Sequence, residues 1–391
     1  MLYGSNIENS KVFMMQLSKV LMAGVYFLFM VCSVAWGQNR LTIDARINGK
    51  EAVFAFDTGT SVSLVLFKQN IKRFNLDITE TKRKEIAHFD FEIGTSKLKA
   101  EALVIDSPPV QVDGLIGWPF LKGKIWAVLW ETKTIARIRS VPEQAKSWLQ
   151  IDLATDVPVL AFAHGKQSKN LIYIDTGDPG GVSLSATCWK RWLKGHPDAP
   201  MTLDAGWSPA TGGISVVRQS WTDRLDLGAL TIPGATVSQI AYKWPRLEAI
   251  VGLEALSHFE VVLDLRESRI YLKRRDGGHL VPEYNRLGAT FAPKSLDSVE
   301  LIAQVLTDSP GYRCGIRDGD ILLRVDDVDM TKWRTDPVIW KRRFWYAEPG
   351  TQYNLELRRG GKRIDLQVTL EEIFPVGRNK KKLNESIPVI R

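Results

Sequence analysis

Residues 53–61 read VFAFDTGTS and begin a pattern that the chain later repeats. The alternation along 53–57 predicts a strand, with Val53, Ala55 and Asp57 on one face. Asn48-Gly49 precedes it, a dipeptide typical of a tight hairpin turn. A carboxylate on a core-facing position is costly unless it is paired or hydrogen-bonded. Asp57 is therefore a candidate functional residue on physical grounds alone.

The same tripeptide occurs twice. Asp57-Thr58-Gly59 ends the first apolar run, and Asp175-Thr176-Gly177 ends the run LIYI at 171–174. Each copy is followed, much further along, by two branched aliphatic residues and a glycine: Leu115-Ile116-Gly117 in the first half and Ile250-Val251-Gly252 in the second. This doubled pattern predicts two carboxylates in one site, both supplied by a single chain.

The downstream ends of the two halves align without gaps. Positions 117, 121, 128 and 135 match positions 252, 256, 263 and 270 at a constant offset of 135. The two Asp-Thr-Gly copies are only 118 apart, so the second half holds 17 more residues between its motifs (135 − 118). We expect part of this insertion at 205–213. The pattern predicts a duplicated all-β lobe with an internal pseudo-twofold axis.

A third unit follows the two halves. Residues 274–286, with two glycines and a proline, are predicted to form a linker. Beyond it, Ser309-Pro310-Gly311 and Asp318-Gly319-Asp320 separate strand-like runs. The expected boundaries are a leader at 1–37, a first lobe at 38–148, a second lobe at 149–273, the linker at 274–286, a small α+β domain at 287–373 and a basic tail at 374–391.

Length and composition describe a folded protein of two or three domains. The chain has 391 residues, of which 45% are hydrophobic and 25% charged. Its net charge of +8 is spread along the chain and no nucleic-acid-binding motif accompanies it, so we expect no nucleic-acid partner. The five histidines show no ligand spacing, and no metal or other cofactor is expected.

The N-terminus has the pattern of an export signal. An apolar run of 17 residues at 20–36 follows Lys19, and Ala35 and Gly37 are the small residues before a cleavage site at Gln38. The run is also close to the length of a membrane-spanning helix, so an uncleaved anchor is the alternative. Either way, we expect the folded domains to be exported.

Residues 40–273 resemble aspartic peptidases of the pepsin and retropepsin type, bacterial retropepsin-like families in particular. The matching residues are Asp57-Thr58-Gly59-Thr60-Ser61 with Leu115-Ile116-Gly117, and the second copy of both motifs. The third unit resembles a PDZ domain of the bacterial protease-associated kind, through Ser309-Pro310-Gly311, Gly315-Ile316 and 318–321. The resemblance implies a mainly β fold: two β-barrel lobes in one chain plus a small α+β PDZ domain.

The resemblance also implies an activity. Asp57 and Asp175 would activate a water for hydrolysis of peptide bonds in a peptide or protein substrate, and the protein would act as a monomer. The PDZ domain would bind protein C-termini. The residues that the family assigns to support of the two aspartates are Thr58, Gly59, Thr60, Thr176 and Gly177. The loop that the family assigns to the peptide terminus is Leu287, Gly288, Ala289, Thr290 and Phe291.

One position departs from the family pattern. Asp178-Pro179 follows the second Asp-Thr-Gly, where a small or hydroxyl residue is expected. If the Asp178 side chain points inward, a third carboxylate raises the proton affinity of the pair. If it points to solvent, the loop lacks the support that Thr60 gives its counterpart. The alternative function that follows is a catalytically inactive peptidase fold that binds peptides or serves as a scaffold.

Overall fold

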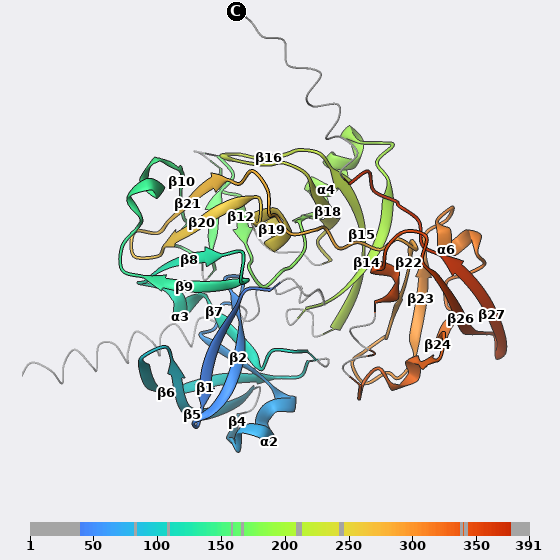
Figure 1. Ribbon diagram of the computed structural model, residues 1–391, viewed down its shortest axis with the longest axis horizontal. Coiled ribbons are helices and arrows are strands. Elements are labelled where there is room, and N and C mark those ends of the chain that lie inside the picture. Colours follow the sequence, from blue (N-terminus) through green and yellow to red (C-terminus); the bar gives the residue numbers. More distant parts are fainter. Residues whose placement is uncertain are drawn as a thin grey trace, which may run out of the picture.

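The structure is a computed structural model. It describes residues 40–376 except 82–83, 108–109, 158, 166–167, 209–212, 242–245, 337–338 and 340–342. The predicted leader at 1–37 and most of the predicted basic tail lie outside the described residues. The chain is mainly β, as predicted, and its strands form two lobes and a third domain (Figure 1). None of the helices in the described ranges is long and apolar enough to cross a membrane.

The first lobe begins with two strands joined at Asn48-Gly49, whose φ angles of 49° and 77° fit the predicted hairpin. Its elements are β1 (Thr42–Ile47), β2 (Lys50–Asp57), β3 (Leu64–Phe67), η1 (Lys68–Asn70), α2 (Ile71–Phe74), β4 (Asp77–Thr81), β5 (Lys84–Ile93), β6 (Ser96–Ile105), β7 (Gly114–Gly117), α3 (Trp118–Leu121), β8 (Ile125–Leu129), β9 (Thr134–Ile138) and η2 (Glu143–Ser147).

The second lobe repeats this plan. Its elements are β10 (Leu149–Asp152), β11 (Ala161–Ala163), β12 (Leu171–Ile174), β13 (Val182–Leu184), α4 (Ala186–Gly195), β14 (Met201–Ser208), β15 (Gly213–Thr222), β16 (Leu225–Leu227), β17 (Leu230–Ile232), β18 (Ala235–Gln239), β19 (Leu247–Val251), α5 (Leu253–Leu256), β20 (Phe259–Asp264) and β21 (Arg269–Arg274).

In both lobes one short strand is sandwiched between two others. β7 pairs parallel with β2, placing Asp57 opposite Gly117, and antiparallel with β3. β19 pairs in the same two ways with β12 and β13. Because the central strand ends beside each Asp-Thr-Gly loop, the downstream glycines lie next to the aspartates. The two distant sequence motifs of each half therefore meet.

The two lobes share a sheet and a core. The offset of 135 reappears in the structure, because α3 and α5 begin and end 135 residues apart. The terminal hairpins β8–β9 and β20–β21 pair through β8 and β20, joining the lobes in a 12-stranded sheet. One buried apolar cluster includes Phe56 and Trp126 of the first lobe and Trp189 and Leu256 of the second.

The 17 additional residues of the second half are distributed along it. The helix α4 of 10 residues stands where the first lobe has only η1 and α2. Strand β14 has 8 residues where β4 has 5, and the hairpin β16–β17 separates β15 from β18. The stretch 205–213 was expected to hold part of the insertion, and the end of the longer β14 lies there. It lies in the hairpin β14–β15.

The third domain has a core of its own and a six-stranded sheet. Both β14 and β15 contact its first strand, so the hairpin of the second lobe lies against the third domain (Figure 1). Its elements are β22 (Ala289–Ala292), β23 (Leu301–Val305), α6 (Pro310–Arg313), β24 (Ile321–Val325), β25 (Val328–Asp329), η3 (Met330–Lys332), η4 (Phe344–Tyr346), β26 (Gln352–Arg359) and β27 (Lys362–Thr369).

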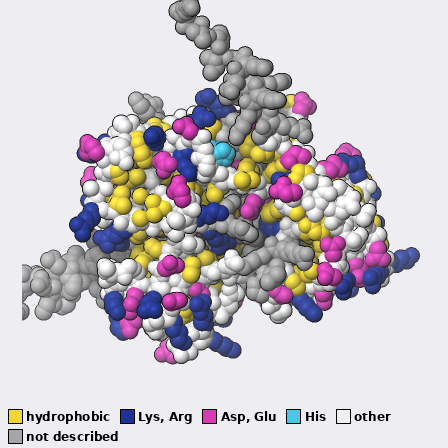
Figure 2. Space-filling model, viewed as in Figure 1, with side chains coloured by type: hydrophobic (Ala, Val, Ile, Leu, Met, Phe, Trp, Pro, Cys, Tyr) yellow, Lys and Arg dark blue, Asp and Glu magenta, His cyan; other side chains and the backbone are white. Residues whose placement is uncertain are grey.

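The segments on either side of this domain belong to its packed part. Residues 284–286, within the predicted linker, are buried, and the backbone oxygen of Asn285 accepts a hydrogen bond of 2.7 Å from Thr202 of β14. Phe374, the first residue of the predicted tail, is buried with its ring 4.5 Å from that of Tyr284. On the face shown in Figure 2, acidic and basic side chains are interspersed.

Candidate active site

Asp57 and Asp175 lie at matching places in the two lobes. Asp57 is the last residue of β2, and Asp175 follows β12. Their side chains are buried, with 0% and 1% exposure. In each, Oδ1 accepts a hydrogen bond of 2.9 Å from the backbone N–H two residues on, that of Gly59 or Gly177. These bonds hold the two carboxyl groups in the same orientation relative to their own loops.

The adjacent threonines lock the two loops together. Oγ1 of Thr58 donates to the backbone oxygen of Ile174 at 2.6 Å, and Oγ1 of Thr176 donates to that of Phe56 at 2.7 Å. Each hydroxyl also accepts from the other threonine's backbone N–H, at 3.0 and 3.1 Å. Since every bond has its mirror image, the exchange fixes the two aspartates about a local pseudo-twofold axis.

The downstream glycines make room for this approach. A Cβ atom on Gly117 would lie 2.0 Å from the carbonyl oxygen of Val62. One on Gly252 would lie 2.4 Å from that of Gly180. Contacts this short with backbone atoms exclude any side chain at either position. The glycines of the two aliphatic motifs are thus required by packing.

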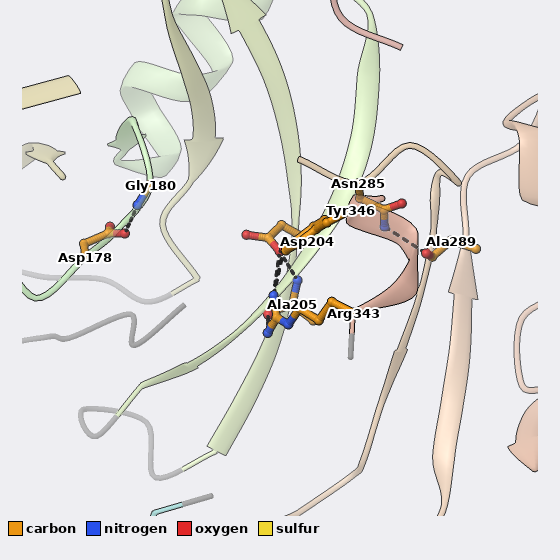
Figure 3. Close-up of polar contacts among 8 residues, drawn as sticks. All are labelled: Asp178, Gly180, Asp204, Ala205, Asn285, Ala289, Arg343 and Tyr346. Atoms are coloured by element: carbon orange, nitrogen blue, oxygen red, sulfur yellow. Dashed lines mark hydrogen bonds and ion pairs between the residues drawn. The ribbon is translucent and has the colours of Figure 1, made fainter. Parts of the chain in front are cut away.

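The symmetry ends at the third residue after each aspartate. Oγ1 of Thr60 donates to Oδ2 of Asp57 at 2.6 Å. Asp178 stands at the matching place in the second loop, is 4% exposed, and accepts from the N–H of Gly180 at 2.9 Å (Figure 3). Of the two orientations that the sequence left open, the structure has the buried one. A third carboxyl group therefore lies at the site.

This arrangement raises the pKa of Asp175 well above its usual value. Burial is the largest cause, followed by the negative charges of Asp57 and Asp178. The hydrogen bond from the N–H of Gly177 works in the opposite direction, and a side-chain hydrogen bond with Asp57 adds to the increase. The two aspartates therefore hold a proton at a pH where an isolated aspartate has lost it.

Glu254 is a further buried acid, which sequence reasoning missed. It lies in α5, is 2% exposed, and accepts from N–H and Oγ1 of Thr236 at 2.7 and 2.6 Å. Burial raises its pKa to about 7, against the effect of the Thr236 bonds, and the charges of Asp178 and Glu283 add to the rise. The available signal was its place between the apolar residues of a four-residue helix directly after Gly252.

Glu254 helps to hold the loop that follows Asp175. Thr236, which donates to Glu254, accepts through Oγ1 a bond of 3.1 Å from the N–H of Gly181. The N–H of Glu254 donates to the backbone oxygen of Gly180 at 3.0 Å. In the first lobe the matching position, 135 residues earlier, is Pro119, which has neither a carboxyl group nor an N–H. This support is therefore particular to the second lobe.

The five residues expected to bind a peptide terminus in the third domain are all buried. The N–H groups of Leu287 and Gly288 donate to Oδ1 of Asn285 at 2.8 and 3.0 Å. Nδ2 of Asn285 donates to the backbone oxygen of Ala289 at 2.8 Å (Figure 3). Thr290 and Phe291 lie in β22, with 0% and 4% exposure. A peptide carboxylate that approaches these amides would have to displace Asn285.

The described residues contain no group of three or more His, Cys, Asp or Glu side chains arranged to hold a metal ion. Two adjacent buried carboxyl groups that share a proton can act as a general acid and a general base toward a molecule placed between them.

No family model and no curated protein matches the chain. Among solved structures, the chain is similar to an aspartic proteinase from Irpex lacteus, with 11% sequence identity and a TM-score of 0.37. The similarity covers 61% of this chain and 95% of that one.

Proposed function

We propose that this chain is an aspartic endopeptidase in which Asp57 and Asp175 activate a water molecule. The observation that carries the proposal is the reciprocal exchange between Thr58 and Thr176, which holds two buried aspartates close enough to interact by charge and by a side-chain hydrogen bond. Buried carboxyl groups held together in this way cannot both ionise cheaply and titrate as a coupled pair. One proton shared by two groups supplies a base and an acid at once.

The different surroundings of the two aspartates support different starting roles for them. Asp57 accepts from Gly59 and from Thr60, and two donors favour its ionised form. Asp175 has a raised pKa, so it holds the proton. Asp57 is then the general base that takes a proton from the water, and Asp175 is the acid that protonates the carbonyl oxygen of the substrate.

The reaction needs no covalent intermediate. The water oxygen adds to the carbonyl carbon, one of its protons passes to Asp57, and the carbonyl oxygen takes the proton of Asp175. As the carbon–nitrogen bond breaks, Asp57 passes its proton to the leaving amine and Asp175 recovers the proton from the hydroxyl group. Both carboxyl groups return to their starting states.

The rest of the proposal concerns the chain around the site. The substrate would be an extended peptide, held between the lobes by backbone hydrogen bonds of the kind that strands form. The third domain would be a PDZ-type domain that binds protein C-termini once Asn285 is displaced. The pattern at 1–37 supports an exported protein, with an uncleaved anchor as the alternative, and the doubled lobe supports a monomer.

The test is cleavage of a diverse peptide mixture by the full chain, from about pH 3 to about pH 8. We expect cleavage by the parent, and a loss of roughly a thousandfold or more in both Asp57→Asn and Asp175→Asn. Asp226→Asn is the matched control, because Asp226 is exposed and pairs with the exposed neighbours Arg224 and Thr231. A folded parent that cleaves no peptide at any pH would contradict the proposal.

A second function is favoured by one observation, the burial of Asp178 where the first loop has Thr60. Three acids at one site can hold too many protons for the pair to act as a base. The chain would then be an inactive peptidase fold that binds peptides. Peptide binding without cleavage by the parent, with cleavage appearing in Asp178→Thr, would identify this case.

A further inference from the structure

The face of the first lobe that carries Asp57 is covered by a side chain from a distant segment. Ala55 of β2 is two residues before Asp57 and so faces the same side of the sheet. Leu115 and Val65 stand opposite it in successive pairs of the ladder, and opposed residues project to the same face. The ring of Trp207, 1% exposed, packs in the same buried cluster as these three residues.

This tryptophan comes from the other lobe. Trp207 lies in β14, opposite Ile214 in β15, so it belongs to the hairpin β14–β15 of the second lobe. Its ring meets that of Phe67 edge to face, with centroids 6.2 Å apart. Ile214 and, from the third domain, Leu296 pack against the same cluster. The hairpin therefore reaches from the second lobe onto the face of the first lobe that carries Asp57.

The indole group fits this place by shape alone. The buried Nε1–H of Trp207 has no hydrogen-bond partner among the described residues. Leaving a buried donor unsatisfied costs free energy, so the polar part of the side chain opposes its own burial. The apolar contacts of the ring outweigh this cost, and a further contact of the hairpin adds to them.

That further contact is the third domain. Tyr346 donates from its hydroxyl group to Oδ1 of Asp204 in β14, and Nη1 of Arg343 lies 3.3 Å from the same oxygen (Figure 3). Nη2 of Arg343 donates to the backbone oxygen of Ala205, and its Nη1 donates to the Tyr346 oxygen at 2.8 Å. The side chains of Arg343 and Asp204 are 8% and 18% exposed, so little water reaches this ion pair.

We propose that the hairpin β14–β15 is a built-in strap that blocks the active site, with Trp207 in the place of a substrate side chain and the third domain as its clamp. This inference rests on the proposed function, because it concerns access to the same site. The aspartates are buried, and while Trp207 packs on the Ala55–Leu115 face a peptide cannot lie there. Catalysis requires the strap to lift, and the contact of Arg343 and Tyr346 with Asp204 sets how often it does.

The experiment uses the full chain and two variants, one for each end of the strap. Trp207→Ala removes the blocking ring, and Arg343→Met removes the clamp. Their controls are Trp221→Ala, on the same hairpin but outside the cluster, and Arg313→Met, an exposed arginine of the third domain that pairs with Glu371. Trp207→Leu serves as a second variant should the alanine variant unfold.

Two readouts are measured. If the lifted strap makes up about a tenth of the population, both variants raise kcat/KM for the peptide mixture roughly tenfold, and the controls stay within about twofold of the parent. Amide hydrogen exchange over 201–208 and 213–222, measured in an Asp57→Asn background, becomes faster in Arg343→Met and is unchanged in Arg313→Met. The exchange readout requires no catalysis.

The outcomes separate the two proposals. A lower kcat/KM with a higher KM in Trp207→Ala would overturn the strap, since Trp207 would then be a wall of the substrate site. Unchanged exchange in Arg343→Met would overturn the clamp. If neither the parent nor any variant cleaves a peptide, the proposed activity is wrong. Hydrogen exchange in Arg343→Met and Arg313→Met then decides whether the third domain holds the hairpin in place.

Discussion

The two Asp-Thr-Gly loops have nearly the same backbone and different chemical surroundings. In both, the residue three after the aspartate accepts, through its backbone oxygen, a bond from the start of the next short helix: Trp118 to Thr60 at 2.9 Å, and Leu253 to Asp178 at 2.7 Å. In the first loop that residue supports its aspartate with a hydroxyl group. In the second it adds a negative charge.

The difference shows how a duplicated fold can produce an asymmetric site. Backbone bonds depend on the path of the chain, and both halves follow the same path. The protonation of each aspartate depends instead on single side chains at positions 60 and 178, and on Glu254 opposite Pro119. Each of the following predictions tests one element of this comparison, from the largest expected effect to the smallest.

Replacing the downstream glycine should destabilise the fold equally in both lobes. Gly117→Ala and Gly252→Ala each force a methyl group against a backbone carbonyl, and we expect each to cost about 4 kcal/mol or more of the free energy of unfolding. Denaturant titration measures it. Gly195→Ala is the control, because open space surrounds Gly195. A mild effect in one lobe alone would mean that the two loops are packed differently.

Glu254 should make the stability of the second lobe depend on pH. Its pKa of about 7 in the folded chain exceeds the ordinary value of 4.5, so folding favours the protonated form. The associated stability is complete below about pH 4.5 and is lost as pH rises through about 7. The loss is on the order of 3 kcal/mol, at about 1.4 kcal/mol per pKa unit.

Glu254→Gln should remove this loss, so that the variant equals the parent at low pH and exceeds it in stability at pH 8. Urea titrations of both proteins across this range measure the difference. Burial lowers the pKa of His258 from 6.5 to about 4, so its contribution to the stability of the fold is lost as pH falls from about 6.5 to about 4. Its contribution cancels in the difference between the two proteins. If the free energy of unfolding changes with pH in the same way in the parent and in the variant, Glu254 does not titrate in this range.

The reciprocal hydrogen bonds of Thr58 and Thr176 should contribute equally to the free energy of unfolding. Thr58→Val and Thr176→Val each remove a hydroxyl group that both donates and accepts, leaving buried backbone groups unsatisfied. We expect each to lower the free energy of unfolding by about 2 kcal/mol, and the double variant by less than the sum. Thr231→Val, at an exposed hydroxyl, is the control. If the two single variants lose different amounts of stability, the backbone hydrogen bonds of the two loops also differ in strength.

Asp178 should shift the pH range of activity. Its charge raises the pKa of Asp175, so Asp178→Thr should lower the pKa at which the pair loses its shared proton. We therefore expect the alkaline limb of the kcat/KM profile to move to lower pH in this variant. Asp226→Thr, at an exposed site of the same lobe, is the control. An unmoved alkaline limb would show that the charge of Asp178 does not reach the pair.

Local patterns predicted much of the architecture. The alternation before Asp57, the hairpin at Asn48-Gly49 and the offset of 135 are properties of short segments and of their spacing. A strand, a tight turn and a repeat unit impose their periods on the sequence, so they can be identified without knowledge of distant contacts. The doubled lobe was predicted from this spacing, and the pairing of the two aspartates from the repeated Asp-Thr-Gly motif with its downstream glycine.

The tertiary structure alone settled where the remaining side chains lie. The burial of Asp178, the role of Glu254, the seat of Trp207 on the first lobe and the closure of the 287–291 loop by Asn285 all involve partners that no short-range pattern predicts. Thr58 and Thr176 are 118 residues apart, and Arg343 is 139 residues from Asp204. The sequence by itself determined that two aspartates share one site. Packing between distant segments decided their electrostatic surroundings, because charge and burial depend on neighbours in space.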